Sequence, residues 1–303
     1  FLAASSRFGC WLCTKSTPQR PPPNTATVVR DWGGVGVEQS RTDEDQRAVG
    51  RGHKACLTKG ARETCVRDHS GRFSVLHLLP YFCCIWSYVV DPMHCIFLGV
   101  VKKTLQLWID TPRIPEDRTP GGSETEKILN NKALSERMLQ VQLPTDVGRI
   151  FKKWHNPKGL GRLTAADMKN FLLLLSVTLL EGLIPKRHMV MWKHLVEGAR
   201  ALVSSHIVLL DELKATQLHL LTFCQLFEDA HGRDKMTPNM HVMLHLVQFV
   251  VLYGPCHVFW CFAFERYNKI LTEVRNNRTS IEISIMKRFT RHQQLYEYAC
   301  TSP

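Results

Sequence analysis

One stretch, Val89–Trp108, constrains the fold of this chain more than any other. From Met93 onward its apolar residues recur three and four positions apart, as on the buried face of an amphipathic helix; they are Met93, Ile96, Phe97, Val100, Val101, Leu105 and Trp108. Asp91 stands at the N-cap position and Pro92 at the first helical position, where these residue types are favoured. The pattern predicts a helix that begins at Pro92 and buries one face.

The same period dominates the rest of the chain, so we expect a mainly helical fold. Thr164 with Asp167 has the spacing of a capping box, and Thr237-Pro238 has the form of another helix start. Helices are expected over residues 126–140, 164–180, 211–230, 238–252 and 265–274, after Pro185 with a stripe from Met189 to Val203, and from Thr279 onward. Residues 73–82 should form a short helix or turn. Residues 85–90 look strand-like, and residues 258–264 form either a buried strand or the entry to a helix.

Residues 15–72 differ in composition from the rest of the chain. Pro18 and Pro21–Pro23 break regular structure, and glycines and mixed charges follow them through Gly60. Such a segment lacks the apolar residues that a packed element needs. We therefore expect a long exposed loop, largely disordered, after the segment 1–14.

Charge and cysteine content narrow the classes of protein. The formal net charge is +12 and the pI about 9.3, which suits a polyanion such as nucleic acid, although many basic proteins bind none. The 11 cysteines without a signal peptide favour a reducing compartment, nuclear or cytoplasmic rather than secreted. No apolar run is long enough for a membrane span. Because the chain begins with Phe, we expect a fragment, a processed product or an incomplete gene model.

Two short motifs have the spacing of zinc ligands. Cys10 and Cys13 form a C-x-x-C knuckle, and His241 and His245 are four residues apart on one predicted helix, so both imidazoles can reach one ion. Together they would make a tetrahedral site that joins the two ends of the chain. On spacing alone the alternatives stay open, namely two free thiols and two ordinary helix histidines.

Three further features have both a functional and a structural interpretation. Asp91 and His94 can line or brace an active site, or they can simply cap a helix. Glu265, next to an apolar run, can bind a divalent cation or pair with Lys269. The basic residues of the last helix can contact phosphates or form a solvated face; they are Lys287, Arg288 and Arg291.

Four segments occur in a familiar order: RFGCWLC, VVDPMHCIFLGVVKKTLQLW, NMHVMLHLVQFVVLYGP and FAFERYNKIL. Together they resemble the transposases of the CACTA (En/Spm-like) superfamily and the transposase-domain-containing proteins derived from them. The resemblance runs with gaps over residues 8–274 and is thin in 15–60 and 111–159. It implies an RNase H-like nuclease core, in which three carboxylates hold two divalent metals, Mg²⁺ or Mn²⁺, for DNA cleavage and strand transfer.

The resemblance also implies roles for single residues. Glu265 matches the third catalytic carboxylate, and Asp91 with His94 matches the Asp-x-x-His motif that precedes it. The C-x-x-C and the His pair match as well, which strengthens the prediction of a zinc site made from Cys10, Cys13, His241 and His245. Two departures matter: the family's first two aspartates precede the C-x-x-C, where residues 1–9 contain no acidic residue, and Lys269 stands where relatives often have Gly.

We therefore expect the C-terminal part of a transposase, inactive as a nuclease. Its fold would be mainly α, with a core-to-insertion segment over 73–110, a helical insertion domain over 111–255 and a partial RNase H-like (α/β) core remnant over 256–303. The alternative is a non-catalytic, zinc-stapled helical module that binds DNA or protein. A third possibility is a decaying transposon remnant with no selected role.

Overall fold

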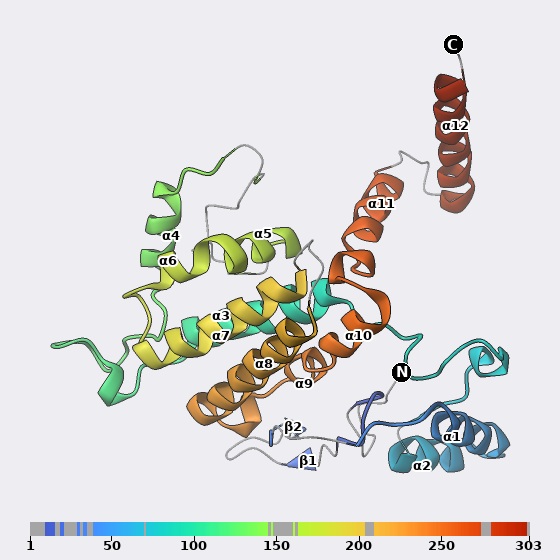
Figure 1. Ribbon diagram of the computed structural model, residues 1–303, viewed down its shortest axis with the longest axis horizontal. Coiled ribbons are helices and arrows are strands. Elements are labelled where there is room, and N and C mark those ends of the chain that lie inside the picture. Colours follow the sequence, from blue (N-terminus) through green and yellow to red (C-terminus); the bar gives the residue numbers. More distant parts are fainter. Residues whose placement is uncertain are drawn as a thin grey trace. The chain divides into compact units, whose positions relative to one another are not determined.

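The structure is a computed structural model (Figure 1) that describes residues 10–15, 19–20, 29–30, 33–34, 39–69, 71–144, 147, 160, 163–203, 209–273 and 280–301. The chain divides into two compact units, Phe1–Phe259 and Trp260–Pro303. Both are mainly helical in their described parts, as predicted. The one strand pair there, β1 (Gln19–Arg20) with β2 (Val29–Arg30), is antiparallel and two residues long.

The first unit contains most of the described helices. The α-helices are α1 (Asp43–Ala55), α2 (Lys59–His69), α3 (Lys102–Asp110), α4 (Asn131–Gln140), α5 (Ala165–Asn170), α6 (Ser176–Leu180), α7 (Lys186–Val203), α8 (Leu210–His231), α9 (Pro238–Met243) and α10 (Leu246–Tyr253). Shorter elements are the 3₁₀ turns η1 (Val75–Leu78), η3 (Pro115–Asp117), η7 (Arg233–Lys235) and η8 (Cys256–Val258), and the π-helical stretches η2 (Met93–Val101) and η6 (Phe171–Leu175). The second unit contains α11 (Phe262–Thr272) and α12 (Ile281–Thr301).

The stretch around Met93 is the centre of the first unit, as its periodicity predicts. η2 continues directly into α3, and η2 packs against both α5 and α9. The predicted apolar face is buried, and Ile96, Val100 and Trp108 have no exposed surface. Asp91 caps the start of this helix, because its carboxylate accepts hydrogen bonds from the backbone N–H groups of Met93 and His94, both at 3.1 Å.

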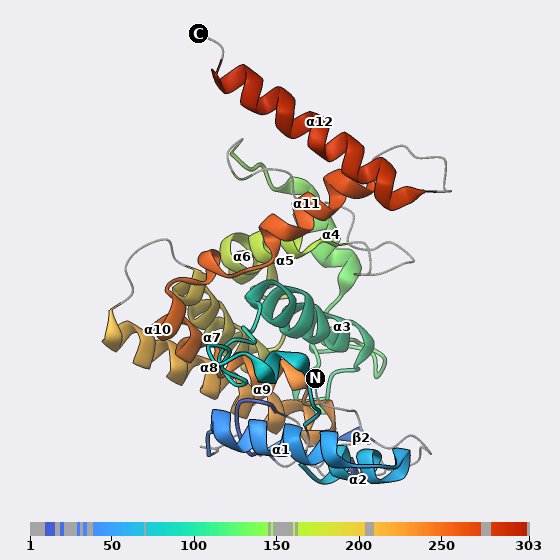
Figure 2. The ribbon, with the colours of Figure 1, turned by 90° about the vertical axis from the view of Figure 1, so that its right-hand side faces the viewer.

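Helices α7 and α8 form an antiparallel pair beside this central helix (Figures 1 and 2). They approach closely at Gly198, where an added Cβ would lie 2.5 Å from Leu220 Cδ2, so only glycine fits without a shift. Trp192 of α7 packs its ring on Trp108 and donates its Nε1–H to Ser176 Oγ at 2.8 Å. The buried face of α7 therefore packs against α3, α6 and α8.

The prediction of a loop over residues 15–72 is wrong for the residues that form α1 and α2. Thr42 Oγ1 accepts a hydrogen bond from the N–H of Asp45 at 3.1 Å and so caps α1. Three acidic residues, Asp43, Glu44 and Asp45, fill the first turn, where they complement the helix dipole. These local signals outweigh the overall polarity of the segment. The predicted Pro-rich part, residues 18 and 21–23, lies outside the described residues.

Several predicted boundaries also need correction. Residues 85–90 form a turn, a bend and irregular backbone and not a strand, and the polar helix begins at Asn131 rather than Glu126, because Asn130 Oδ1 caps it. Residues 258–264 lead into α11 but are not buried, since Val258 and Phe264 are 63% and 67% exposed. Among the described residues no single helix is long and apolar enough to cross a membrane; one bent pair, Pro238–Tyr253 with Cys256–Thr272, passes the same test of length and composition.

Candidate metal centre

The N-terminal half of the centre is a tight turn that carries Cys10 and Cys13. Both thiols are buried, and the N–H of Leu12 donates to Cys10 Sγ at 3.3 Å. A short antiparallel ladder holds the turn against the residues before α1: Thr14 N–H donates to Gln39 O and Arg41 N–H to Leu12 O, both at 2.9 Å. The turn is therefore fixed on the backbone that leads into α1.

The C-terminal half comes from α9 and the break that follows it. Thr237 caps α9 and Pro238 occupies its first turn, as predicted. The predicted continuous helix 238–252 is interrupted at Leu244 and His245, so His241 lies in α9 and His245 immediately before α10. His245 Nδ1 lies 3.0 Å from Gln248 Oε1. With the proton on Nδ1 it donates to that oxygen, which leaves Nε2 as the ligand atom.

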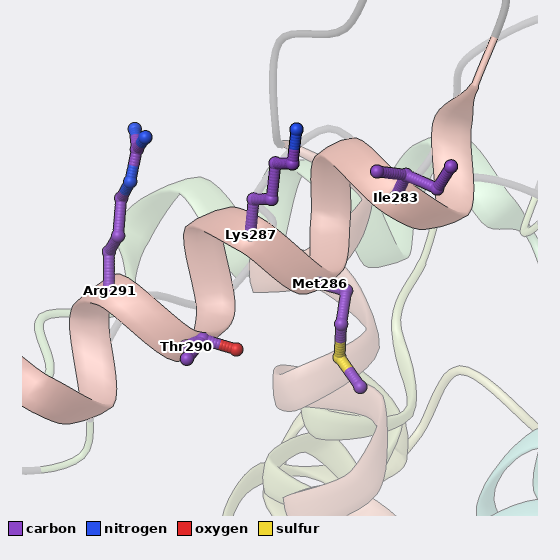
Figure 3. A pocket seen from close by; sticks show the side chains of 5 residues that line it. All are labelled: Ile283, Met286, Lys287, Thr290 and Arg291. Carbon is purple, nitrogen blue, oxygen red and sulfur yellow. The ribbon is translucent and has the colours of Figure 1, made fainter.

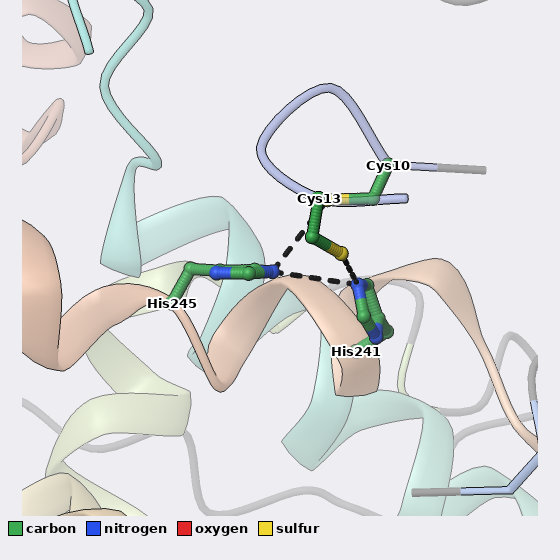
Figure 4. A group of neighbouring side chains, drawn as sticks. All are labelled: Cys10, Cys13, His241 and His245. Atoms are coloured by element: carbon green, nitrogen blue, oxygen red, sulfur yellow. Dashed lines mark hydrogen bonds between the residues drawn. The ribbon is translucent and has the colours of Figure 1, made fainter. Parts of the chain in front are cut away.

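The four side chains face one another (Figure 4). Cys10 Sγ lies 3.6 Å from His245 Nε2, Cys13 Sγ lies 3.3 Å from His241 Nε2, and the two Nε2 atoms are 3.4 Å apart. Around zinc, with bonds of about 2.3 Å to sulfur and 2.0 Å to nitrogen, tetrahedral directions place S and N roughly 3.5 Å apart and N and N roughly 3.3 Å apart. The three distances are close to the corresponding edges of that tetrahedron, and all four ligand atoms lie within 4.8 Å of one another.

The two thiols differ in acidity. The pKa of Cys10 is lowered, chiefly because the Cys13 side chain hydrogen-bonds to it, with help from the Leu12 and Cys13 N–H groups and the charge of Arg41. The pKa of Cys13 is raised by the same contact with Cys10 and by burial, against the hydrogen bonds of His241 and His245. Cys10 therefore ionises first, and a cation between the thiols would favour the second thiolate. Two thiolates and two imidazoles form a ligand set typical of structural zinc.

Two residues near the centre were not predicted. Gln248 orients His245, and its position three residues further along the helix could have indicated this. Arg41 donates through Nε to Cys13 O at 3.0 Å and through a second nitrogen to His69 O at 3.4 Å. Arg41 thereby connects the turn that carries Cys10 and Cys13, the metal turn, with the end of α2. No sequence signal marked Arg41, because it lies in the segment that was predicted to be a loop.

The structure brings Asp91 and His94 together at the start of η2. His94 Nδ1 lies 2.5 Å from Asp91 Oδ2, and the side chains are 54% and 15% exposed respectively. Because the same carboxylate caps the helix, the structural interpretation of Asp91 is confirmed. The His94 side chain remains largely exposed. The catalytic role that the resemblance implies for the pair stays a prediction.

Glu265 and the predicted phosphate-binding residues lie in the second unit. Glu265 is exposed in the first turn of α11. The alternative pairing partner, Lys269, forms its ion pair with Glu273 instead, at 3.7 Å. On α12, Lys287, Arg288 and Arg291 are all exposed. Figure 3 shows Lys287 and Arg291 one turn apart with their side chains on the same side of α12, beside a shallow pocket that Ile283, Met286 and Thr290 also line.

No protein-family model, no curated protein and no solved structure matches this chain. The arrangement that the structure itself defines is a helical unit with a buried Cys₂His₂ cluster, which joins residues more than 200 positions apart.

Proposed function

We propose that this chain is a non-catalytic, zinc-stapled helical module that binds DNA in the nucleus or cytoplasm and derives from a CACTA-type transposase. The single observation that carries the proposal is the close grouping of the possible ligand atoms of Cys10, Cys13, His241 and His245. All four contribute sulfur or imidazole nitrogen atoms. These soft or borderline ligands bind zinc in preference to Mg²⁺ or Mn²⁺. The net charge of +12 supports a polyanionic partner.

The ancestry rests on the order of the four sequence blocks, and it makes α11 with Glu265 the last piece of an RNase H-like core. A non-catalytic role is favoured because two-metal nuclease chemistry needs several oxygen ligands that converge. Among the described residues of the first unit, no three carboxylates lie together. The proposal therefore assigns Mg²⁺ or Mn²⁺ to the ancestral enzyme.

Metal content tests the staple directly. Purified protein, dialysed against metal-free buffer, should carry one zinc per chain by elemental mass spectrometry. The double variant Cys10→Ser/Cys13→Ser should lose it. Cys56→Ser/Cys65→Ser is the matched control, because it removes two half-buried thiols outside the cluster and should keep the zinc. Wild-type protein without zinc would overturn the proposed staple.

Activity and DNA binding test the other parts. Binding to duplex DNA should weaken steeply as salt rises, and no cleavage or joining should occur with Mg²⁺ or Mn²⁺. A Mg²⁺-dependent nuclease activity that Glu265→Gln abolishes would show that the chain is an active enzyme. Zinc binding without any DNA binding would leave a zinc-stapled protein whose partner is not DNA.

A further inference from the structure

The later part of α1, together with α2 and the residues that follow it, presents a basic surface that the sequence did not indicate; the acidic residues Asp43, Glu44 and Asp45 lie apart from it, in the first turn of α1. From residue 46 to residue 72 the chain has seven arginines and lysines but only two carboxylates, Glu63 and Asp68. Six of these basic side chains are exposed, and together they define the basic hairpin surface: Arg51, Lys54, Lys59, Arg62, Arg67 and Arg72.

Most of this positive charge is not neutralised within the hairpin. Lys59 pairs with Glu63 at 3.9 Å and Arg67 with Asp68 at 3.1 Å. Within the described part of the chain, Arg51, Lys54, Arg62 and Arg72 form no ion pair with a carboxylate.

The charges also converge in space. Lys54 Nζ lies 4.7 Å from the centroid of the Phe73 ring, next to Arg72 in the chain. The pKa of His53 is lowered, first by desolvation and then by the charges of Arg62 and Arg72. Arg62 and Arg72 therefore act on the same site from different segments, and the positive potential is concentrated around the end of α1.

The basic hairpin surface is accessible to a partner, and hydrogen bonds fix α1 to the neighbouring segment. Gly52 and Gly60 have nothing within 4 Å of an added Cβ, so a partner backbone can approach the hairpin closely at both helices. Arg47 of α1 donates hydrogen bonds to the carbonyl oxygens of His77, Leu79 and Phe82, which fixes α1 to that segment. A charged surface on a fixed support loses little conformational entropy when it binds a partner.

We propose that the basic hairpin surface is the docking site for the phosphodiester backbone of nucleic acid; this rests on the proposed DNA-binding function and names its interface. Phosphate is the partner chemistry because arginine and lysine dominate the surface. Only Leu57 is a large apolar side chain exposed on these two helices or the turn between them, whereas a membrane-binding surface needs an apolar face.

The test compares three triple variants of the full chain. Arg51→Gln/Lys54→Gln/Arg62→Gln removes three hairpin charges. Lys103→Gln/Lys132→Gln/Lys186→Gln removes three charges from exposed lysines elsewhere in the first unit. The third, Lys287→Gln/Arg288→Gln/Arg291→Gln, removes the tail charges that the sequence singled out. Each is titrated with fluorescent duplex DNA, single-stranded DNA, polyglutamate and anionic lipid vesicles at several salt concentrations, and helicity and zinc content report folding.

The hairpin variant should bind duplex or single-stranded DNA at least about tenfold more weakly at low salt, with the slope of log affinity against log salt reduced by about 2–3. The surface-lysine variant should lose much less. Equal losses in the hairpin and surface-lysine variants, or a loss confined to the tail variant, would overturn the interface while leaving DNA binding intact. Stronger binding to polyglutamate or vesicles than to DNA would also overturn it. If the wild-type protein did not bind DNA, the proposed DNA-binding function itself would be contradicted.

Discussion

At the scale of single residues, the fully buried His188 and its partly buried neighbour His231 stand out in the first unit. His188 is fully buried, and neither of its ring nitrogens has a hydrogen-bond partner. Its ring stacks on His231 with centroids 5.0 Å apart, and Trp108 Nε1–H donates to His231 Nε2 at 3.2 Å. Burial lowers the pKa of His188 to about 3 and that of His231 to about 4, with nearby positive charges acting in the same direction.

These shifts predict that acid destabilises the first unit. The unfolded histidines, with a pKa near 6.5, bind protons that the folded ones exclude, so the free energy of unfolding should fall as pH decreases from about 6.5 towards 4. His188→Leu removes one side chain that binds a proton in the unfolded state but not in the folded state. It also removes a buried polar group without a hydrogen-bond partner. Thermal melts at pH 8 and pH 5 should show a smaller drop in Tm for His188→Leu than for wild type. The exposed control His69→Leu should follow wild type, and an equal drop in all three proteins would contradict the prediction.

At the scale of elements, the helix starts that carry a capping signal in the sequence were predicted best. Asp91-Pro92, Thr164 with Asp167, and Thr237-Pro238 all begin helices as expected, because each signal acts within one turn. The strand prediction for residues 85–90 was wrong because apolar and aromatic residues suit a partly buried irregular segment as well as a strand. Helix α1 was missed because its cap stands in a polar segment, and its attachment to residues 77–84 depends on contacts that no local pattern reveals.

Arg47 makes that attachment, and its replacement should loosen it. Its Nε donates to Asp43 Oδ2 at 2.6 Å, while Asp43 Oδ1 accepts from the Cys84 N–H at 2.5 Å. Arg47→Met would leave three carbonyl oxygens without their charged donor and so weaken the attachment of residues 77–84 to α1. Amide exchange of residues 75–84 should accelerate, whereas α7 and α8 should keep their protection. Arg51→Met, one turn further along α1, is the control, and equal exchange in both variants would contradict this role.

At the scale of the whole molecule, the sequence predicted which four residues form the candidate metal centre, but not the hydrogen bonds that connect this centre to the rest of the fold. The C-x-x-C and His-x-x-x-His spacings named all four residues, because each spacing places two ligand atoms within reach of one ion. Nothing in the sequence indicated that a helix break at His245 or the reach of Arg41 completes the arrangement. The joining of Cys13 to His241 closes a loop across 228 positions, and such closure is a property of the folded chain alone.

Those connections predict the order in which the first unit loosens when zinc is removed. The metal turn is tied to α1 through the Leu12–Arg41 and Thr14–Gln39 hydrogen bonds and to α2 through Arg41. Helices α7 and α8 are instead held by Gly198, Trp192 and the buried core. Chelation should therefore accelerate amide exchange in residues 39–69 and in α9 first, and lower Tm by roughly 10 °C. Because Arg41→Lys loses the two-carbonyl contact but no metal ligand, it should loosen residues 39–69 while zinc stays bound. Loss of protection throughout α7 and α8 at the same chelator concentration would instead mean that zinc holds the whole unit.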